Sequence, residues 1–227
     1  MTESHWNVEL HSHTYWSIDC LVDFERIIDI CAARNIDKIA ITDHNTADGA
    51  LAFKKIAPDL VIVGEEIFTT QGELLAYFVQ ETIPPGLTPQ ETIRRLKDQG
   101  AVISVSHPFD LNRRGRWKKE HLDQIIDQVD AIETFNARCL TDAENERAQA
   151  YAQANNLRGT VGSDAHTAAE YGRSMLQMTP FADADAFRAA LATAVPLTDR
   201  SPFHVHFGST FAKWSRKLGF SQRPTAN

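Results

Sequence analysis

The stretch Val8-Glu9-Leu10-His11-Ser12-His13-Thr14 organises the chain. It is predicted to be a strand, in which successive side chains point to opposite faces, so the imidazoles of His11 and His13 share one face. Two neutral imidazoles side by side form half of a site for a metal such as Zn, Mn or Fe. Alone, the pair is weak evidence, because a solvated or hydrogen-bonded His-x-His is the commoner case.

Four later strand-like runs end in similar residues. They are Ile41-Thr42-Asp43-His44, Val63-Gly64-Glu65-Glu66, Ser104-Val105-Ser106-His107 and Gly162-Ser163-Asp164-Ala165-His166. The candidate ligands come last in their strands or just beyond them, and they are His44, Glu66, His107, Asp164 and His166. Functional residues of α/β barrels lie at the carboxyl ends of the strands. These positions favour a polynuclear metal centre at the mouth of a barrel.

The chain alternates strand-like and helix-like segments with short connections. Predicted strands cover 8–14, 37–43, 60–64, 101–106, 131–135, 158–162 and 174–178, and predicted helices cover 23–35, 48–57, 88–100, 120–128, 142–155, 183–194 and 209–218. About seven strand–helix units in one chain indicate a parallel sheet, open or closed.

Three further predictions concern a hairpin, the C-terminal end and the number of domains. Residues 68–79, centred on Gln71-Gly72, are predicted to form a hairpin inserted into the alternation. Residues from 221 onward are expected to be frayed. We expect residues 1–227 to be a single domain with a C-terminal tail from about 200, since the chain has no repeats and no low-complexity linker.

Composition excludes several classes of protein. A formal net charge of -7, with a pI near 5.7, argues against a non-specific nucleic-acid grip or a basic membrane surface. Three widely spaced cysteines without a CxxC motif are typical of reduced thiols. There is no signal-peptide pattern and no apolar run as long as a membrane span. We therefore expect a cytoplasmic protein that binds neither membranes nor, stably, duplex nucleic acid; the oligomeric state stays open.

The motifs resemble those of the PHP family, named after polymerase and histidinol phosphatase. The matching segments run in the family's order over nearly the whole chain: Glu-Leu-His-Ser-His-Thr (9–14), Ile-Thr-Asp-His-Asn (41–45), Gly-Glu-Glu-Ile (64–67), Ser-His-Pro-Phe (106–109) and Gly-Ser-Asp-Ala-His (162–166). The resemblance implies an α/β fold, a distorted (β/α)7 TIM-like barrel. It also implies metal-dependent phosphoesterase chemistry with two or three divalent ions, usually Mn, Fe or Zn.

The resemblance further implies how the metal ligands divide. The first ion would take His11, His13, Glu66 and Asp164, with Glu66 bridging to a second ion held by His107. A third ion would take Asp19, His44 and His166. Asn136 stands where the family often has a further His, so its amide oxygen is a candidate ligand. Some relatives have His in place of Asp19, and the harder carboxylate favours Mn or Fe.

Several charged residues are candidates for other roles. Asp164 or His166 could protonate the leaving oxygen, and the planar guanidinium of Arg138 suits bidentate phosphate binding. Arg173 is predicted to contact substrate phosphate too, with a surface salt bridge as its equal alternative.

Four further features have expected roles outside the metal site. Residues 113–119 are either a steering patch for an anionic substrate or a solvated charge run. Asp43 is expected to orient His44, and Glu65 to flank Glu66 without binding metal. His204 and His206 form a second His-x-His in a strand-like run. They could approach the barrel mouth, but a structural or subunit-contact role is expected, because the set of metal ligands is nearly complete without them.

The predicted function is hydrolysis of a small phosphate ester, a nucleotide or a short oligonucleotide by attack of metal-activated hydroxide on phosphorus. Divalent ions supply such a nucleophile near neutral pH and offset charge on the phosphoryl group. Neither a Gly-rich phosphate loop nor a serine elbow is present in the sequence. Two alternatives stay open: a metal-dependent hydrolase of a non-phosphorus substrate, and a non-catalytic regulatory PHP module, against which the nearly intact ligand set argues.

Overall fold

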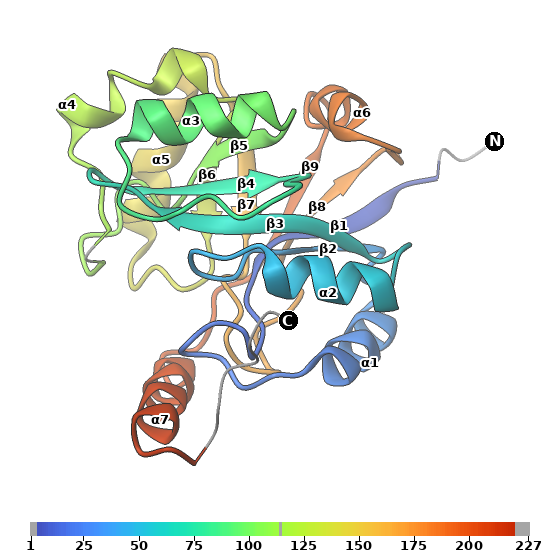
Figure 1. Ribbon diagram of the computed structural model, residues 1–227. Helices are drawn as coiled ribbons and strands as arrows, with labels where there is room; N and C mark the ends of the chain where they lie inside the picture. Colours follow the sequence, from blue (N-terminus) through green and yellow to red (C-terminus); the bar gives the residue numbers. More distant parts are fainter. Residues whose placement is uncertain (1–3, 114, 221–227) are drawn as a thin grey trace.

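The computed structural model describes residues 4–113 and 115–220 (Figure 1). Within these ranges nine strands form one sheet, in the order β7-β6-β5-β4-β3-β2-β1-β8-β9. The strands are β1 (Trp6–Ser12), β2 (Lys38–Ile41), β3 (Val61–Phe68), β4 (Glu73–Tyr77), β5 (Val102–Val105), β6 (Ala131–Asn136), β7 (Arg158–Gly162), β8 (Ser174–Met178) and β9 (Val195–Thr198). The helices are α1 (Phe24–Arg34), α2 (Asp48–Ile56), α3 (Pro89–Asp98), α4 (Lys119–Leu122), the 3-10 turn η1 (Ile126–Gln128), α5 (Asp142–Ala154), α6 (Ala184–Ala190) and α7 (Val205–Lys217).

The sheet curves into a nearly closed barrel whose wall runs from β1 to β7. The closing contact is a parallel bridge between Ser12 and Ala165, supported by a hydrogen bond of 3.0 Å from the His13 N–H to the Ala165 carbonyl. Neighbouring strands of the wall are parallel except β4, which is antiparallel to both β3 and β5. The predicted α/β barrel is confirmed. It departs from a regular barrel of parallel strands at β4, which runs in the opposite direction to its neighbours.

The predicted insertion at 68–79 is wrong in one respect. The hairpin exists, but its first arm is β3 itself, which pairs with β4 from Gly64 opposite Tyr77 to Phe68 opposite Glu73. Because β4 pairs with β5 on its other edge, it belongs to the barrel wall. As a result Glu66 lies inside β3 and is not its last residue.

Three other expectations differ from the structure. The helix expected at 120–128 is split into α4 and η1. The edge strand β9 was not predicted, because it contains Pro196 and its four residues are exposed to solvent instead of alternating between buried and exposed. The strand expected around His204 and His206 is wrong, since His204 directly precedes α7 and His206 lies in its first turn. The fraying expected from 221 onward lies outside the described residues.

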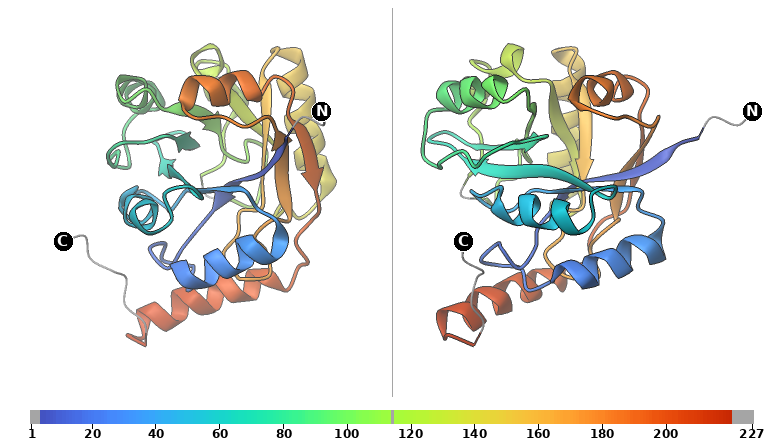
Figure 2. Two further views of the ribbon diagram at one scale, coloured as in Figure 1. Left: turned by 90° about the vertical axis from the view of Figure 1, so that its right-hand side faces the viewer. Right: turned by 45° about the vertical axis from the view of Figure 1, so that its right-hand side comes forward.

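Helices pack against the outside of the barrel, as both views in Figure 2 show. Several begin at a capping side chain: Asp23 accepts from the Arg26 N–H at 2.9 Å, and Thr88 accepts from the Glu91 N–H at 3.2 Å. Helix α6 covers the end where the parallel strands begin. There Arg188 donates to the Ala101 carbonyl at 2.8 Å.

An apolar core fills this amino-terminal end. The ring of Phe187 in α6 is fully buried, with its centroid 5.0 Å from Phe181, 5.5 Å from Phe78 and 5.7 Å from Tyr77. The opposite, carboxyl end of the barrel carries the polar residues. None of the helices in the described part of the chain is long and apolar enough to cross a membrane.

Candidate metal centre

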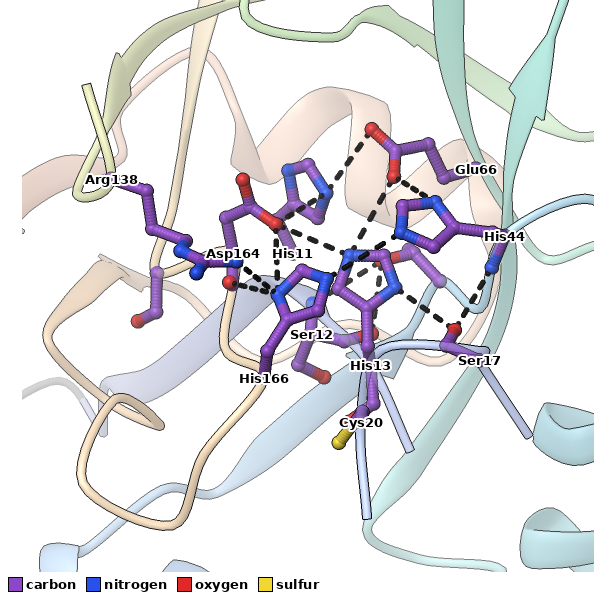
Figure 3. A network of polar contacts seen from close by, with 12 residues as sticks. His11, Ser12, His13, Ser17, Cys20, His44, Glu66, Arg138, Asp164 and His166 are labelled. Carbon is purple, nitrogen blue, oxygen red and sulfur yellow. Dashed lines mark hydrogen bonds and ion pairs between the residues drawn. The ribbon is translucent and has the colours of Figure 1, made fainter. Parts of the chain in front are cut away.

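The predicted ligand residues meet at the carboxyl end of the barrel. Figure 3 labels six of them, His11, His13, His44, Glu66, Asp164 and His166. The imidazole of His13 lies at the middle, with its ring centroid 4.2 Å from His44, 4.1 Å from His166 and 5.2 Å from His11. His11 lies in β1, and the other three histidines lie in the loops that follow β1, β2 and β7. Glu66 in β3 and His107 in the loop after β5 complete the cluster. Residues far apart in sequence therefore form one buried cluster.

Local backbone geometry presents these side chains. The pairing of β1 with β2 is irregular between Glu9 and Ser12, and the Glu9 carboxylate accepts from the His11 N–H at 3.2 Å. His107 and Asp164 have φ of 22° and 52°, a region that residues other than glycine rarely adopt. Irregular strands and strained backbones recur at functional sites.

Glu66 touches four imidazoles. Its Oε1 lies 3.0 Å from His107 Nε2 and 3.4 Å from His11 Nε2, and its Oε2 lies 2.8 Å from His44 Nδ1 and 3.6 Å from His13 Nε2. Burial favours the neutral acid, but the charges of His11 and His44 hold the pKa of Glu66 well below its usual range. A buried carboxylate of this kind is placed to be shared between two cations.

Asp164 forms a second centre of contacts. Its Oδ1 lies 3.2 Å from His13 Nε2, 3.6 Å from His11 Nε2 and 3.4 Å from His166 Nδ1. Its other oxygen accepts from Arg113. Burial opposes ionisation, but the charges of Arg113 and His11 hold the pKa of Asp164 well below its usual range.

Asp19 joins the outer part of the cluster. Its Oδ1 lies 3.4 Å from Nε2 of both His44 and His166, whose own Nε2 atoms are 3.5 Å apart. Its Oδ2 lies 3.1 Å from Nζ of Lys213 in α7. The predicted third set of ligands thus converges, and α7 contributes a cation to it.

The donor atoms fit divalent metals. Three groups place their ligand atoms within 4.8 Å of one another: His13, His44 and His166; His11, His13 and Glu66; and Glu66, Glu73 and His107. Several buried atoms make no hydrogen bond with the described residues, namely Nε2 of His11 and His13, Oε2 of Glu66, and Oδ1 of Asp19 and Asp164. Buried polar atoms are normally paired. Mixed imidazole and carboxylate donors suit Zn, Mn and Fe.

Hydrogen bonds around the cluster hold its histidines, through a ring nitrogen or through the backbone N–H. Glu133 Oε1 lies 2.9 Å from His11 Nδ1, and Glu133 Oε2 accepts from the His107 N–H at 2.7 Å. Asp43 accepts from the Ser17 hydroxyl at 2.6 Å, and the Ser17 oxygen in turn accepts from the His44 N–H at 3.1 Å. Such contacts orient metal ligands. Asp43 thus reaches His44 through Ser17.

Sequence reasoning missed Glu133 and Glu73. Glu73 Oε2 lies 3.5 Å from His107 Nε2. The available signal was an acidic residue inside an otherwise apolar strand, as in Ala131-Ile132-Glu133. Glu65 lies in the same kind of strand but faces away: its carboxylate accepts from the Ile83 N–H at 2.9 Å, and burial raises its pKa to about 8.

The side chain of Asn136 is oriented unfavourably for the expected ligand role. Its amide oxygen accepts from the Arg138 N–H at 2.9 Å, while Nδ2 lies 3.1 Å from Glu133 and 3.3 Å from Asp164. The cluster therefore meets the amide nitrogen, which cannot bind a metal as the oxygen would.

Arg138 and Arg173 lie in different places. Arg138 is buried, with Nη1 2.8 Å from His166 Nδ1 and Nε 3.2 Å from Glu170 Oε1. Arg173 forms an ion pair with Asp199 at the start of the segment after β9. Arg173 is not among the residues that line the cavity beside Asp19 and His166. Its ion pair matches the surface salt bridge that was the alternative to phosphate binding.

A cavity of about 310 Å³ opens beside Asp19 and His166. Its wall carries three cations, Arg113, Arg138 and Lys213, together with other residues including Phe203 and His206. Of the basic run 113–119, Arg113 thus reaches the cavity, whereas Lys119 pairs with Asp123 on the surface, and residue 114 lies outside the described residues. The wall also carries the acids Asp19 and Asp110, and each of the three cations is paired with an acid. The cavity therefore joins a cluster suited to metal with a wall of mixed charge.

Comparison with known proteins identifies the family. Residues 9–70 match the PHP domain and residues 142–195 match the PHP-associated region. Two proteins of Methanocaldococcus jannaschii are 34% identical: MJ1587 over 57% of this chain and 81% of its own length, and MJ0417 over 76% of this chain and 70% of its own length. The chain belongs to the PHP family.

Solved structures share the fold. PsfC from Pseudomonas syringae superposes with a TM-score of 0.67 at 19% identity, over 94% of this chain and 99% of its own. A two-domain protein from Bacteroides vulgatus, described as containing a predicted PHP-like metal-dependent phosphoesterase, gives 0.69 at 19% identity over 86% and 65%. The lesion-specific endonuclease PfuEndoQ from Pyrococcus furiosus gives 0.61 at 14% identity over 85% and 57%.

Proposed function

We propose that the protein is a metal-dependent phosphoric ester hydrolase. The observation that carries the proposal is the set of buried imidazole and carboxylate atoms without hydrogen bonds, gathered between Glu66 and Asp164 beside a cavity of mixed charge. In this proposal His11, His13, Glu66 and Asp164 hold one divalent ion, and Glu66 is shared with a second ion at His107. Asp19, His44 and His166 hold a third.

Divalent ions of Mn, Fe or Zn would supply an activated water and offset phosphoryl charge. The chain's own residues then bind and orient the substrate. Arg113 and Lys213 face the cavity as donors for phosphate oxygens. Arg138, held by Glu170 and 2.8 Å from His166 Nδ1, positions that imidazole as well as lining the cavity. His166 also lines the cavity, but Arg138 occupies its Nδ1 and the third ion would occupy its Nε2, so the proton for the leaving oxygen would come from water in the cavity.

The cavity favours a substrate in which a phosphate adjoins a flat or apolar group. Leu140 and the ring of His206, which also line the cavity, can pack against a sugar or base. Candidate substrates are therefore a small phosphate ester, a nucleotide or the end of a short oligonucleotide. The endonuclease activity named for one structural neighbour is consistent with the latter two.

The test combines elemental analysis of the purified protein with phosphate release from a panel of nucleotides and sugar phosphates. We expect two or three equivalents of Mn, Fe or Zn and phosphate release, both reduced in His107→Ala. Metal with hydrolysis of amides or lactones, but of no phosphate ester, would replace the proposal with hydrolysis of a non-phosphorus substrate. Absence of metal after chelator-free purification would favour the regulatory module.

A further inference from the structure

Helix α7 has an inner face that is fixed to the barrel. Val205, Ser209 and Ala212 are buried along it. Arg138 donates to the Ser209 hydroxyl at 2.9 Å, and Arg216 donates to the Cys20 carbonyl at 2.9 Å. With the ion pair between Lys213 and Asp19, these contacts define which side of α7 faces the body of the protein.

The opposite face of α7 carries an apolar stripe that is open to solvent. The stripe is defined by residues spaced four, four, three and four apart, with their exposed fractions: Phe203 (66%), Phe207 (67%), Phe211 (67%), Trp214 (67%) and Leu218 (60%). At 3.6 residues per turn this spacing keeps Phe207, Phe211 and Trp214 on one side of α7, and Phe203 and Leu218 flank its two ends. Figures 1 and 2 show α7 at the margin of the molecule, with the barrel and α1 on its inner side only.

The stripe is large enough for a stable interface. An aromatic side chain offers roughly 150–250 Å² of surface, so the exposed fractions sum to about 600 Å². Soluble monomers rarely expose a contiguous apolar patch of more than a few hundred Å². One partner of a standard interface contributes about 600–1,000 Å². The stripe reaches that range before any flanking polar contact is counted.

We propose that a second copy of this chain covers the stripe, with the two α7 helices antiparallel about a two-fold axis at Phe211. This arrangement sets Phe203 against Leu218, and Phe207 against Trp214, of the other copy. Apolar residues then meet at every level, as an isologous interface requires.

The charges of α7 select the antiparallel arrangement. The basic residues Lys213, Arg216 and Lys217 lie in its C-terminal half, and the helix contains no acidic residue. Lys213 and Arg216 are held on the inner face, so Lys217 is the charge that parallel packing would bring against its own copy, whereas antiparallel packing places it beside the half that starts at Val205. Because the stripe and the inner face are opposed, the two barrels would lie on opposite sides of the helix pair without collision.

The proposed pairing would also support the cavity. Helix α7 supplies His206 and Lys213 to the cavity wall, so a helix held between two bodies would keep both in place. Dimerisation through the stripe is independent of the chemistry proposed for the site, and it is measured as a change in molecular mass.

The first experiment is light scattering on the full-length protein at micromolar concentration. We expect a mass near twice the 25.4 kDa of the chain. The double variant Phe211→Glu/Trp214→Glu should be monomeric with an unchanged circular dichroism spectrum, since both side chains are two-thirds exposed. Ile56→Glu, a matched change at an exposed apolar residue of α2 that is 59% exposed, should remain dimeric. A monomeric wild type, or a dimeric double variant, would overturn the proposal.

A cysteine series tests the orientation. Phe211→Cys should form an intermolecular disulfide on mild oxidation, because the proposed axis pairs this residue with itself, and the three native cysteines are buried. Phe203→Cys alone should not cross-link, but it should do so when mixed with Leu218→Cys. Cross-linking of Phe203→Cys to itself would overturn the antiparallel arrangement. A monomeric wild type that sediments with phosphatidylserine vesicles would overturn the dimer and assign the stripe to a membrane surface.

Discussion

The two ends of the barrel are equally buried but chemically opposite. At the amino end, the rings of Phe181 and Phe187, which carry no polar atom, pack edge to face. At the carboxyl end, Glu66 and His13 are just as inaccessible, yet each has a polar atom without a hydrogen bond. Burial of apolar surface stabilises a fold, whereas burial of polar groups opposes folding unless something pairs with them. The stabilising apolar core and the proposed metal centre therefore lie at opposite ends of the barrel.

The comparison predicts its largest effect at Glu66. Glu66→Gln keeps the size of the side chain but removes the charge that four imidazoles face, so we expect loss of at least one metal equivalent and activity at background level. The adjacent Glu65→Gln is the matched control, because Glu65 is turned towards Ile83. Elemental analysis and phosphate release measure both variants. Equal metal content in the two would contradict the placement of the metal.

The opposite end predicts a loss of stability. Phe187→Ala removes a fully buried ring, so the free energy of unfolding should fall by about 3–5 kcal/mol. Ile56→Ala, at an exposed position, should change it by less than about 0.5 kcal/mol. Urea denaturation measures both. Metal content per folded molecule should be unchanged in Phe187→Ala, and a selective loss of metal would break the separation between the two ends.

A smaller effect is expected one contact away from the ligands. Glu133→Gln keeps the size of the side chain but removes its charge, which weakens the hydrogen bonds to His11 Nδ1 and to the His107 N–H. Removing such a contact lowers metal affinity by about 10- to 100-fold. Competition with a chelator measures the affinity, and circular dichroism checks that the fold is retained. An unchanged affinity would mean that Glu133 serves packing alone.

The smallest effect is expected at the edge of the cavity. Lys213 is half exposed, so Lys213→Ala should raise KM about threefold and leave kcat almost unchanged, since an exposed charge contributes less than about 1 kcal/mol. Lys217→Ala, on the same helix but not lining the cavity, is the control. A fall in kcat without a change in KM would place Lys213 among the groups that act on the reacting atoms.

Much of the carboxyl end was predictable because its signals are local. The His-x-His of β1 and the polar residues after the apolar runs of β2, β5 and β7 each stand out within a few residues. Since parallel strands end at one edge, these residues had to meet. The PHP motifs then added the order in which they occur.

The remaining features depend on contacts between distant segments. Nothing near Glu133 in sequence indicates His11, its partner across the barrel. The orientation of Asn136 is set by a hydrogen bond to its own loop, at Arg138. The run 203–207 alternates apolar and polar residues as a strand does, but the wider spacing of the α7 stripe matches a helix and decides the outcome. The membership of β4 in the barrel required knowing that β5 pairs with it.

The closing contact between β1 and β7 has a consequence for folding. The His13 N–H meets the carbonyl of Ala165, and Asp164 and His166 flank that contact. The cluster therefore has a very high contact order, and such non-local pairing forms late. During synthesis on the ribosome, the first histidines must wait until position 166 has emerged. Metal bound by the full-length chain would thus indicate that the barrel has closed. Helices that refold without barrel closure would not assemble the cluster and would bind no metal there.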